Sequence, residues 1–213
     1  MMFNRSILDI LIGIPGIVIG LAFHEFAHAF TADRLGDPTP RYQGRLTLSP
    51  LPHIDPIGFI MILLLGFGWA KPVQINTRYF KKPRRDEILV SLAGPVTNLL
   101  IAIVFATIIR LLFTSTLLFS MNVRTLSILY SMFDYVIRIN IVLFLFNLMP
   151  LPPLDGFHVL SNIIPLRYYR FTYTLQKYST IILILFIVTN ISSYLIGRPA
   201  GLIYNTILRI FGI

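Results

Sequence analysis

The chain contains an HExxH sequence, His24-Glu25-Phe26-Ala27-His28. On a helix, residues four apart lie on one face about one turn apart, so the two imidazoles could bind a single Zn²⁺ ion. Glu25, about 100° further round the helix, could act as a general base on a water beside the metal. The pattern gains weight here because it lies in an apolar segment, where unsatisfied ionisable side chains are costly.

A catalytic zinc usually takes three protein ligands and keeps one position open. The chain has no cysteine, so the third ligand must be a carboxylate or another histidine. Four aspartates have simpler interpretations as turn residues, ion-pair partners or residues on the wrong helix face: Asp33, Asp37, Asp55 and Asp134. Asp155 differs because it closely follows Pro150, Pro152 and Pro153, which must end a helix at the edge of an apolar span.

The composition around these residues is that of a polytopic membrane protein. Of the 213 residues, 55% are hydrophobic and only 13% are charged, with a mean hydropathy of +0.76. So few charges exclude an ordinary soluble globule, and so much hydrophobicity excludes a disordered chain. The net charge of +9 is typical of basic cytoplasmic loops, so membrane lipid rather than nucleic acid is the expected partner.

We predict an all-α polytopic membrane protein with about four transmembrane helices. Four stretches come near the ~20 residues that cross the hydrocarbon core: 10–32, 88–109, 125–149 and 180–196. The shorter apolar stretch 57–69 predicts a re-entrant or short helix. Its flanks, 43–50 and 72–76, alternate polar and apolar residues and predict a small membrane-associated β-strand layer.

Basic residues predict the orientation. If residues 55–69 do not cross, the 31–85 loop carries nine Lys and Arg, and three more near 167–177 lie on its side, which makes twelve against five opposite. The loop is therefore predicted to be cytoplasmic and both termini extracytoplasmic. The same topology brings His28 and Asp155 to one side of the membrane, so a shared metal site requires that 55–69 does not cross.

Taken together, these motifs resemble those of the site-2 protease family, the zinc intramembrane metalloproteases of peptidase family M50. HExxH matches its zinc motif, residues 147–156 match its NxxPxPxLDG segment, residues 92–98 contain its GxxxN element, and residues 68–73 match a loop of its small bacterial members. The resemblance implies that one Zn²⁺ is bound by three residues, namely His24, His28 and Asp155, with Glu25 as the acid/base. It further implies that Asn98 and Asn147 orient substrate or stabilise the tetrahedral intermediate.

The resemblance also implies a function. The chain would hydrolyse peptide bonds within or near the transmembrane segments of single-pass proteins, with its active site towards the cytoplasm. We expect one domain over 1–213, with a catalytic core at about 6–165, a C-terminal span and interfacial helix at 171–213, and no room for a PDZ or CBS module. His53 and His158 match no required position, although His158, three residues after Asp155, could support it.

Two other functions stay open from the sequence. One is an inactive relative that binds a partner's transmembrane helix without cutting it, against which the intact HExxH and Asp155 argue. The other is a metal-ion transporter, which would need polar residues along the whole path, whereas here they gather towards one side.

Overall fold

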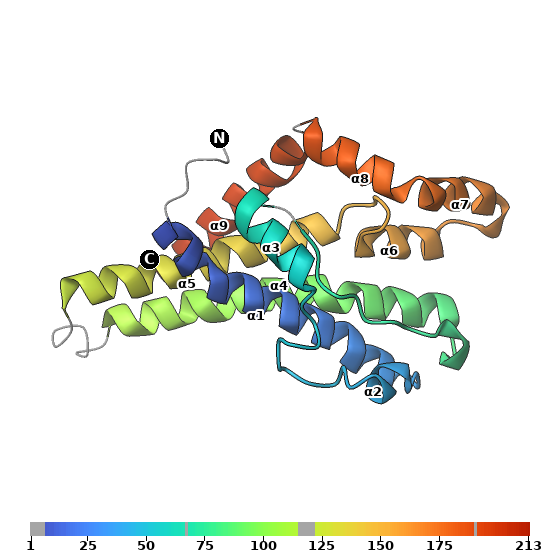
Figure 1. The fold of residues 1–213 in the computed structure, drawn as a ribbon, viewed down its shortest axis with the longest axis horizontal. Coiled ribbons are helices and arrows are strands. Elements are labelled where there is room, and N and C mark those ends of the chain that lie inside the picture. Colours follow the sequence, from blue (N-terminus) through green and yellow to red (C-terminus); the bar gives the residue numbers. More distant parts are fainter. Residues whose placement is uncertain (1–6, 67, 115–121, 190) are drawn as a thin grey trace.

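The computed structural model describes residues 7–66, 68–114, 122–189 and 191–213, and most of these residues are helical (Figure 1). Among them, three helices are long and apolar enough to cross a membrane: α1 (Ile7–Arg34), α4 (Pro83–Thr114) and α5 (Val123–Asn147). At 1.5 Å per residue each exceeds the ~30 Å hydrocarbon core. The predicted all-α, multi-pass architecture is thus confirmed.

A fourth span is bent. α7 (Tyr169–Lys177) and α8 (Ser179–Val188) reach the length of a span only as a pair, with a 65° angle between them. Beyond Val188 the chain is helical again through η4 (Ser193–Gly197) and α9 (Arg198–Phe211). The predicted count of about four spans is therefore met by three helices, or by four if the bent pair is one span.

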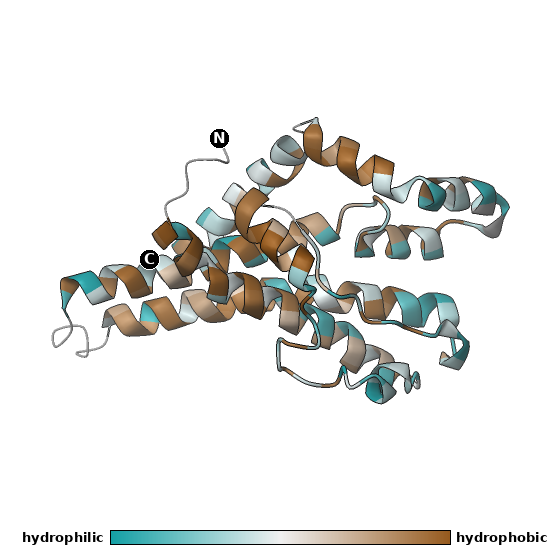
Figure 2. Cartoon of the chain, in the orientation of Figure 1, coloured by the Kyte–Doolittle hydropathy of each residue, from teal (hydrophilic) through white to brown (hydrophobic). Residues whose placement is uncertain are grey.

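The long helices α1, α4 and α5 pack against one another (Figure 1). Small residues let them come close: Gly13, Gly16 and Gly20 on α1 face α5, and a Cβ on Gly16 would lie 3.1 Å from the Val136 Cα. Close backbone approach through small residues is the usual basis of helix packing in membranes. Figure 2 shows apolar residues along most of this bundle, with hydrophilic residues concentrated at the end that carries α2 and α7.

The C-terminal helix α9 packs on α4 and α5. Its Ile207 is buried in a cluster with Ala102, Ala106, Ile137 and Ile141 from the two long helices. A polar contact adds to this packing, because the Tyr204 hydroxyl accepts a hydrogen bond from Arg138 Nη2 at 2.7 Å and donates one to Asp134. The predicted position of this helix at the membrane interface stays a prediction.

The 35–82 loop contains the short helices α2 (Thr39–Tyr42), α3 (Pro56–Leu65) and η1 (Thr77–Tyr79). At ten residues, α3 is about 15 Å long, half the thickness of the hydrocarbon core. An antiparallel bridge joins Ile54 to Ala70, so the chain enters and leaves the α3 region at adjacent points. A short apolar helix is therefore found where the sequence predicted one.

The predicted β-strand layer is wrong. The described part of the loop contains no strand, and the Ile54–Ala70 bridge is isolated. Side chains bind backbone groups in and beside the predicted strands instead: Arg45 donates to the carbonyl oxygens of Pro52, Lys71 and Pro72, and Asp37 accepts from the Asn76 N–H. One stretch without helix or strand, hereafter the 71–76 segment, runs from Ala70 to η1.

After α5 the chain turns through its proline-rich run into α6 (Asp155–Ile163), followed by η3 (Leu166–Tyr168). The Leu154 N–H bonds to Leu151 O at 2.9 Å, which closes the turn. Asp155 is the first residue of α6, and α6 packs against α4. This turn brings the aspartate back to the bundle instead of continuing the direction of α5.

Candidate metal centre

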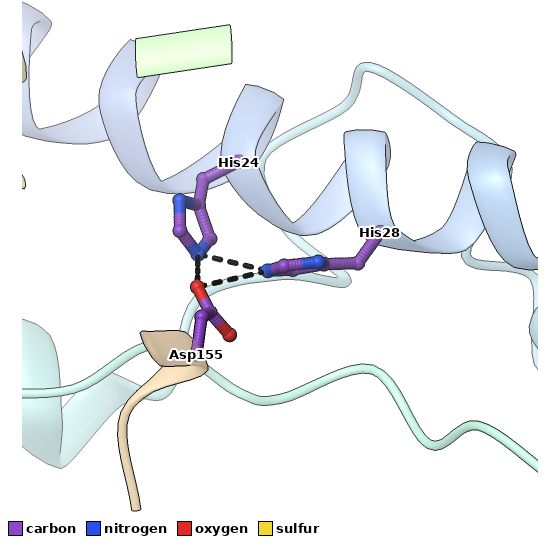
Figure 3. A group of neighbouring side chains, drawn as sticks. All are labelled: His24, His28 and Asp155. Atoms are coloured by element: carbon purple, nitrogen blue, oxygen red, sulfur yellow. Dashed lines mark hydrogen bonds and ion pairs between the residues drawn. The ribbon is translucent and has the colours of Figure 1, made fainter. Parts of the chain in front are cut away.

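His24, His28 and Asp155 meet at one point, as Figure 3 shows. The two histidine Nε2 atoms are 3.0 Å apart, and Asp155 Oδ2 lies 3.1 Å from that of His24 and 3.4 Å from that of His28. Ligand atoms placed tetrahedrally around zinc at 2.0–2.1 Å are about 3.3 Å apart. The triangle therefore has the size that one zinc ion requires.

The hydrogen bonds on the far side of each ring fix which nitrogen faces this point. His24 Nδ1 lies 2.7 Å from Asn98 Oδ1, and His28 Nδ1 lies 2.7 Å from the Val90 carbonyl, so both Nδ1 atoms donate. Each Nε2 then presents a lone pair, and Asp155 Oδ2 is buried with no hydrogen-bond donor. Three lone pairs that face one another repel unless a cation lies between them, so this donor set fits a metal.

Asn98 joins the metal site to all three long helices. Its side chain is fully buried, and its Nδ2 donates to Gly20 O of α1 at 3.0 Å and to Asn140 Oδ1 of α5 at 2.8 Å. Both amide hydrogens are thus used inside the protein, and the oxygen accepts from His24. Sequence reasoning missed Asn140, although a polar residue inside an apolar span is a signal that could have found it.

Gly94 is where α4 lies against the histidines. A Cβ at this position would be 2.6 Å from His24 Cε1 and 2.7 Å from His24 Nε2. Only glycine therefore allows the backbone of α4 to pack against the two imidazoles. Asn147, in the last turn of α5, donates from Nδ2 to Leu143 O at 3.0 Å, and its role towards substrate stays a prediction.

Glu25 lies beside the triad, at a cavity of about 270 Å³ that we call the site cavity. Its charged or titratable lining residues come from α1, α4 and α6: Glu25, His28, Glu87, Asp155 and His158. Part of the 71–76 segment forms another wall, and the Val73 N–H donates to Glu25 Oε2 at 2.9 Å. A partly buried carboxylate next to a metal site and an open cavity can take part in proton transfer.

The remaining histidines have different surroundings. His158 faces the site cavity, and its Nδ1 is 3.4 Å from Glu87 Oε1. Sequence reasoning left His158 open and missed Glu87, although residues 87, 91, 94 and 98 recur with helical spacing and so share one face of α4. His53 is fully buried in the loop, where its Nε2 lies 2.8 Å from Thr47 O, and it has no place in the triad.

These features define a class: a helical, multi-pass membrane protein with a His-His-Asp group that could hold a metal ion and with an adjacent glutamate. Known proteins of similar sequence agree. Residues 12–189 match Peptidase family M50. The chain belongs to this family of metalloproteases, its resemblance to the site-2 proteases is confirmed, and its metal is zinc.

Relatives from three different organisms align with the chain over most of their own length. "Putative zinc metalloprotease YwhC" of Bacillus subtilis (strain 168) is 39% identical over 197 residues, which cover 92% of this chain and 88% of the relative. "Putative zinc metalloprotease Rip2" of Mycobacterium tuberculosis (strain H37Rv) is 29% identical over 191 residues, 86% of this chain and 70% of the relative. The similarly named MJ0611 of Methanocaldococcus jannaschii is 32% identical over 163 residues, 74% and 73% of the two chains. No solved structure matches the chain.

Proposed function

We propose that the protein is an intramembrane zinc metalloprotease that hydrolyses peptide bonds within or near the transmembrane segments of single-pass membrane proteins. The observation that carries the proposal is the convergence of three lone-pair atoms, from His24, His28 and Asp155, beside a carboxylate in one cavity of an apolar bundle. A binding scaffold would have no need for this combination of a metal site and a free base.

In this proposal His24, His28 and Asp155 hold one zinc ion, which when bound polarises a peptide carbonyl and activates a water molecule. Glu25 accepts a proton from the attacking water and returns it to the nitrogen of the leaving amine, so the carboxylate is unchanged after each cycle. Asn98 keeps His24 in the tautomer that presents Nε2. Asn147, by its resemblance to the family motif, helps to position the substrate.

The substrate must be extended at the scissile bond, because a helix hides its carbonyl groups in its own hydrogen bonds. The 71–76 segment offers a backbone outside any helix or strand beside the site cavity, which Val73 and Ile75 both line. A substrate could pair with this segment by strand addition. Helix-breaking residues in the substrate span should therefore speed cleavage.

Charge and packing support a proposed orientation in the membrane. The end of α1, the start of α4 and the start of α6 lie at one end of the bundle, next to the basic 31–85 loop (Figure 1). The excess of basic residues supports our proposal that this end, and with it the active site, faces the cytoplasm. The C-terminus is then extracytoplasmic, and the predicted position of the N-terminus depends on residues 1–6, which lie outside the described residues.

A direct test compares the parent with Glu25→Gln, each reconstituted in liposomes with fluorescent single-span peptides. One peptide carries a central Gly-Pro pair, and another has an uninterrupted poly-Leu span. We expect the parent to cut the Gly-Pro peptide within its span, as mass spectrometry would show, and Glu25→Gln to cut neither. Binding without cleavage by the parent would favour the helix-binding scaffold, and equal cleavage of both peptides would contradict the unwinding step.

A further inference from the structure

The 71–76 segment touches the carboxylate that we assign as the base. Its Val73 N–H donates to Glu25 Oε2 at 2.9 Å, across 48 residues of sequence. Hydrogen bonds from a backbone N–H to a carboxylate are charge-assisted and stronger than those between neutral groups. This contact fixes one carboxylate oxygen and leaves the other free to face a water molecule in the site cavity.

A buried arginine holds one end of the segment. Arg45 is only 6% exposed, and its guanidinium donates to Lys71 O at 3.0 Å and to Pro72 O at 3.4 Å, the two residues before Val73. Nη1 also donates to Pro52 O at 2.5 Å, which ties the segment to the preceding loop. Because these three partners are backbone carbonyls, Arg45 fixes the position of the backbone whatever side chains the segment carries.

A buried aspartate holds the other end. Asp37 is fully buried, and its Oδ2 accepts from the Asn76 N–H at 2.7 Å while its Oδ1 accepts from the Thr39 N–H at 3.0 Å. Asp37 lies three residues beyond α1, the helix that carries Glu25. A buried ionised group is costly once its hydrogen bonds are broken, so both anchors resist movement of the segment.

We propose that Val73 is a positioning residue for peptide hydrolysis. Its backbone N–H holds the Glu25 carboxylate in the orientation that the reaction needs, and Arg45 and Asp37 hold Val73 in place. The inference rests on the proposed function, since it takes Glu25 as the base. It also gives the loop a role besides substrate contact, because the same segment then sets the distance between the base and a bound peptide.

The first test removes the N–H of Val73. Val73→Pro lacks the donor, whereas Val73→Ala keeps it and loses only side-chain atoms. With the Gly-Pro peptide as probe, we expect kcat of Val73→Pro to fall about 10- to 100-fold, the size of a lost hydrogen bond to a charged group. KM should change by less than about threefold, kcat of Val73→Ala should stay well above that of Val73→Pro, and the zinc content of both should equal that of the parent.

A loop proline elsewhere serves as the matched control. Leu51 is 83% exposed and occupies the second position of the turn that the His53 N–H to Pro50 O bond closes at 2.9 Å, where proline is well tolerated. Leu51→Pro should retain the kcat of the parent. If Val73→Pro and Val73→Ala have equal kcat values while the parent cuts the peptide, the positioning role is refuted and the proposed function stands.

A second test needs no cleavage. Because the chain lacks cysteine, Gln74→Cys gives a single thiol for a nitroxide spin label on the exposed side of the segment. We expect Glu25→Ala and Arg45→Gln each to make this label more mobile in its electron paramagnetic resonance spectrum. Asp33→Asn, whose carboxylate pairs with the exposed Arg41, should leave the spectrum as in the parent. Identical spectra in all four backgrounds would overturn the proposal even if no peptide were ever cut.

Discussion

Residues far apart in sequence have different roles at the candidate metal centre. His24, His28 and Asp155 present lone pairs to one point, while Asn98 and the Val90 carbonyl fix the two imidazole tautomers from behind. The proposed ligands and the groups that support them are therefore one connected unit. Substituting any of these side chains should lower the affinity for the metal before it destabilises the fold.

Asp155→Ala should lose the metal. We expect about one zinc per chain in the parent and a large loss in the variant after identical purification without chelators, measured by inductively coupled plasma mass spectrometry. Asp33→Asn is the control, since Asp33 pairs with the exposed Arg41 and lies outside the triad. Full zinc in Asp155→Ala would remove Asp155 from the site.

Asn98→Ala should weaken zinc binding without removing a ligand. The variant leaves His24 Nδ1 without its acceptor and Asn140 Oδ1 without its donor. Loss of a supporting hydrogen bond of this kind typically costs 10- to 100-fold in metal affinity or activity, which a competition titration with a chelating dye would measure. Asn122→Ala, at the N-cap of α5, should bind zinc like the parent. An unchanged affinity in Asn98→Ala would mean that His24 needs no support.

At the scale of elements, glycines and buried polar groups decide where helices come close. Gly94 lets α4 lie on the histidine face of α1, and the glycine stripe of α1 does the same towards α5. The loop is held by side chains instead of a β-ladder. On the other side of the bundle, Asp134, Arg138 and Tyr204 link α5 to α9.

Tyr204→Phe tests that link. The variant keeps the ring, over which Arg138 lies 3.9 Å from the centroid, but removes the hydroxyl that bonds Arg138 and Asp134. We expect the free energy of unfolding in detergent to fall by about 1–2 kcal/mol, with unchanged zinc content. Tyr178→Phe, at an exposed tyrosine, is the control. Equal thermal stability of Tyr204→Phe and the parent would show that the hydroxyl bonds contribute nothing to the α5–α9 contact.

At the scale of the whole molecule, topology and catalysis depend on each other. The metal site forms only if the chain reaches Asp155 on the side where α1 ends. The short α3 satisfies this condition. Its two flanks meet at the Ile54–Ala70 bridge, so the chain returns to the side from which it came. The twelve basic residues counted on this side then predict that it faces the cytoplasm.

Single cysteines can test the orientation, because the chain has none of its own. Tyr42 in α2 is 84% exposed and Val123 at the start of α5 is 81% exposed. In intact bacterial cells, a membrane-impermeant maleimide should label Val123→Cys, and it should label Tyr42→Cys only after permeabilisation. The opposite pattern would invert the topology and place the active site outside the cytoplasm.

Local properties of the sequence determined much of this protein. Helical periodicity places His24 and His28 on one face, hydropathy marks α1, α4 and α5, and the prolines before Asp155 predict the end of α5. Each of these three features depends on residues within a few turns of one another, so the sequence alone is enough to predict it. The family resemblance rests on the same local motifs.

Only the tertiary structure decided how distant groups pair. Nothing local shows that Asn140 supports Asn98, that Glu87 meets His158, or that the Val73 N–H bonds Glu25. The same limit explains the wrong strand prediction: alternation in 43–50 and 72–76 is compatible with strands, but in the folded chain Arg45 binds the Pro72 carbonyl and Asp37 binds the Asn76 N–H. Which partner a polar group finds depends on how the three long helices and the loop pack, and packing is a property of the whole chain.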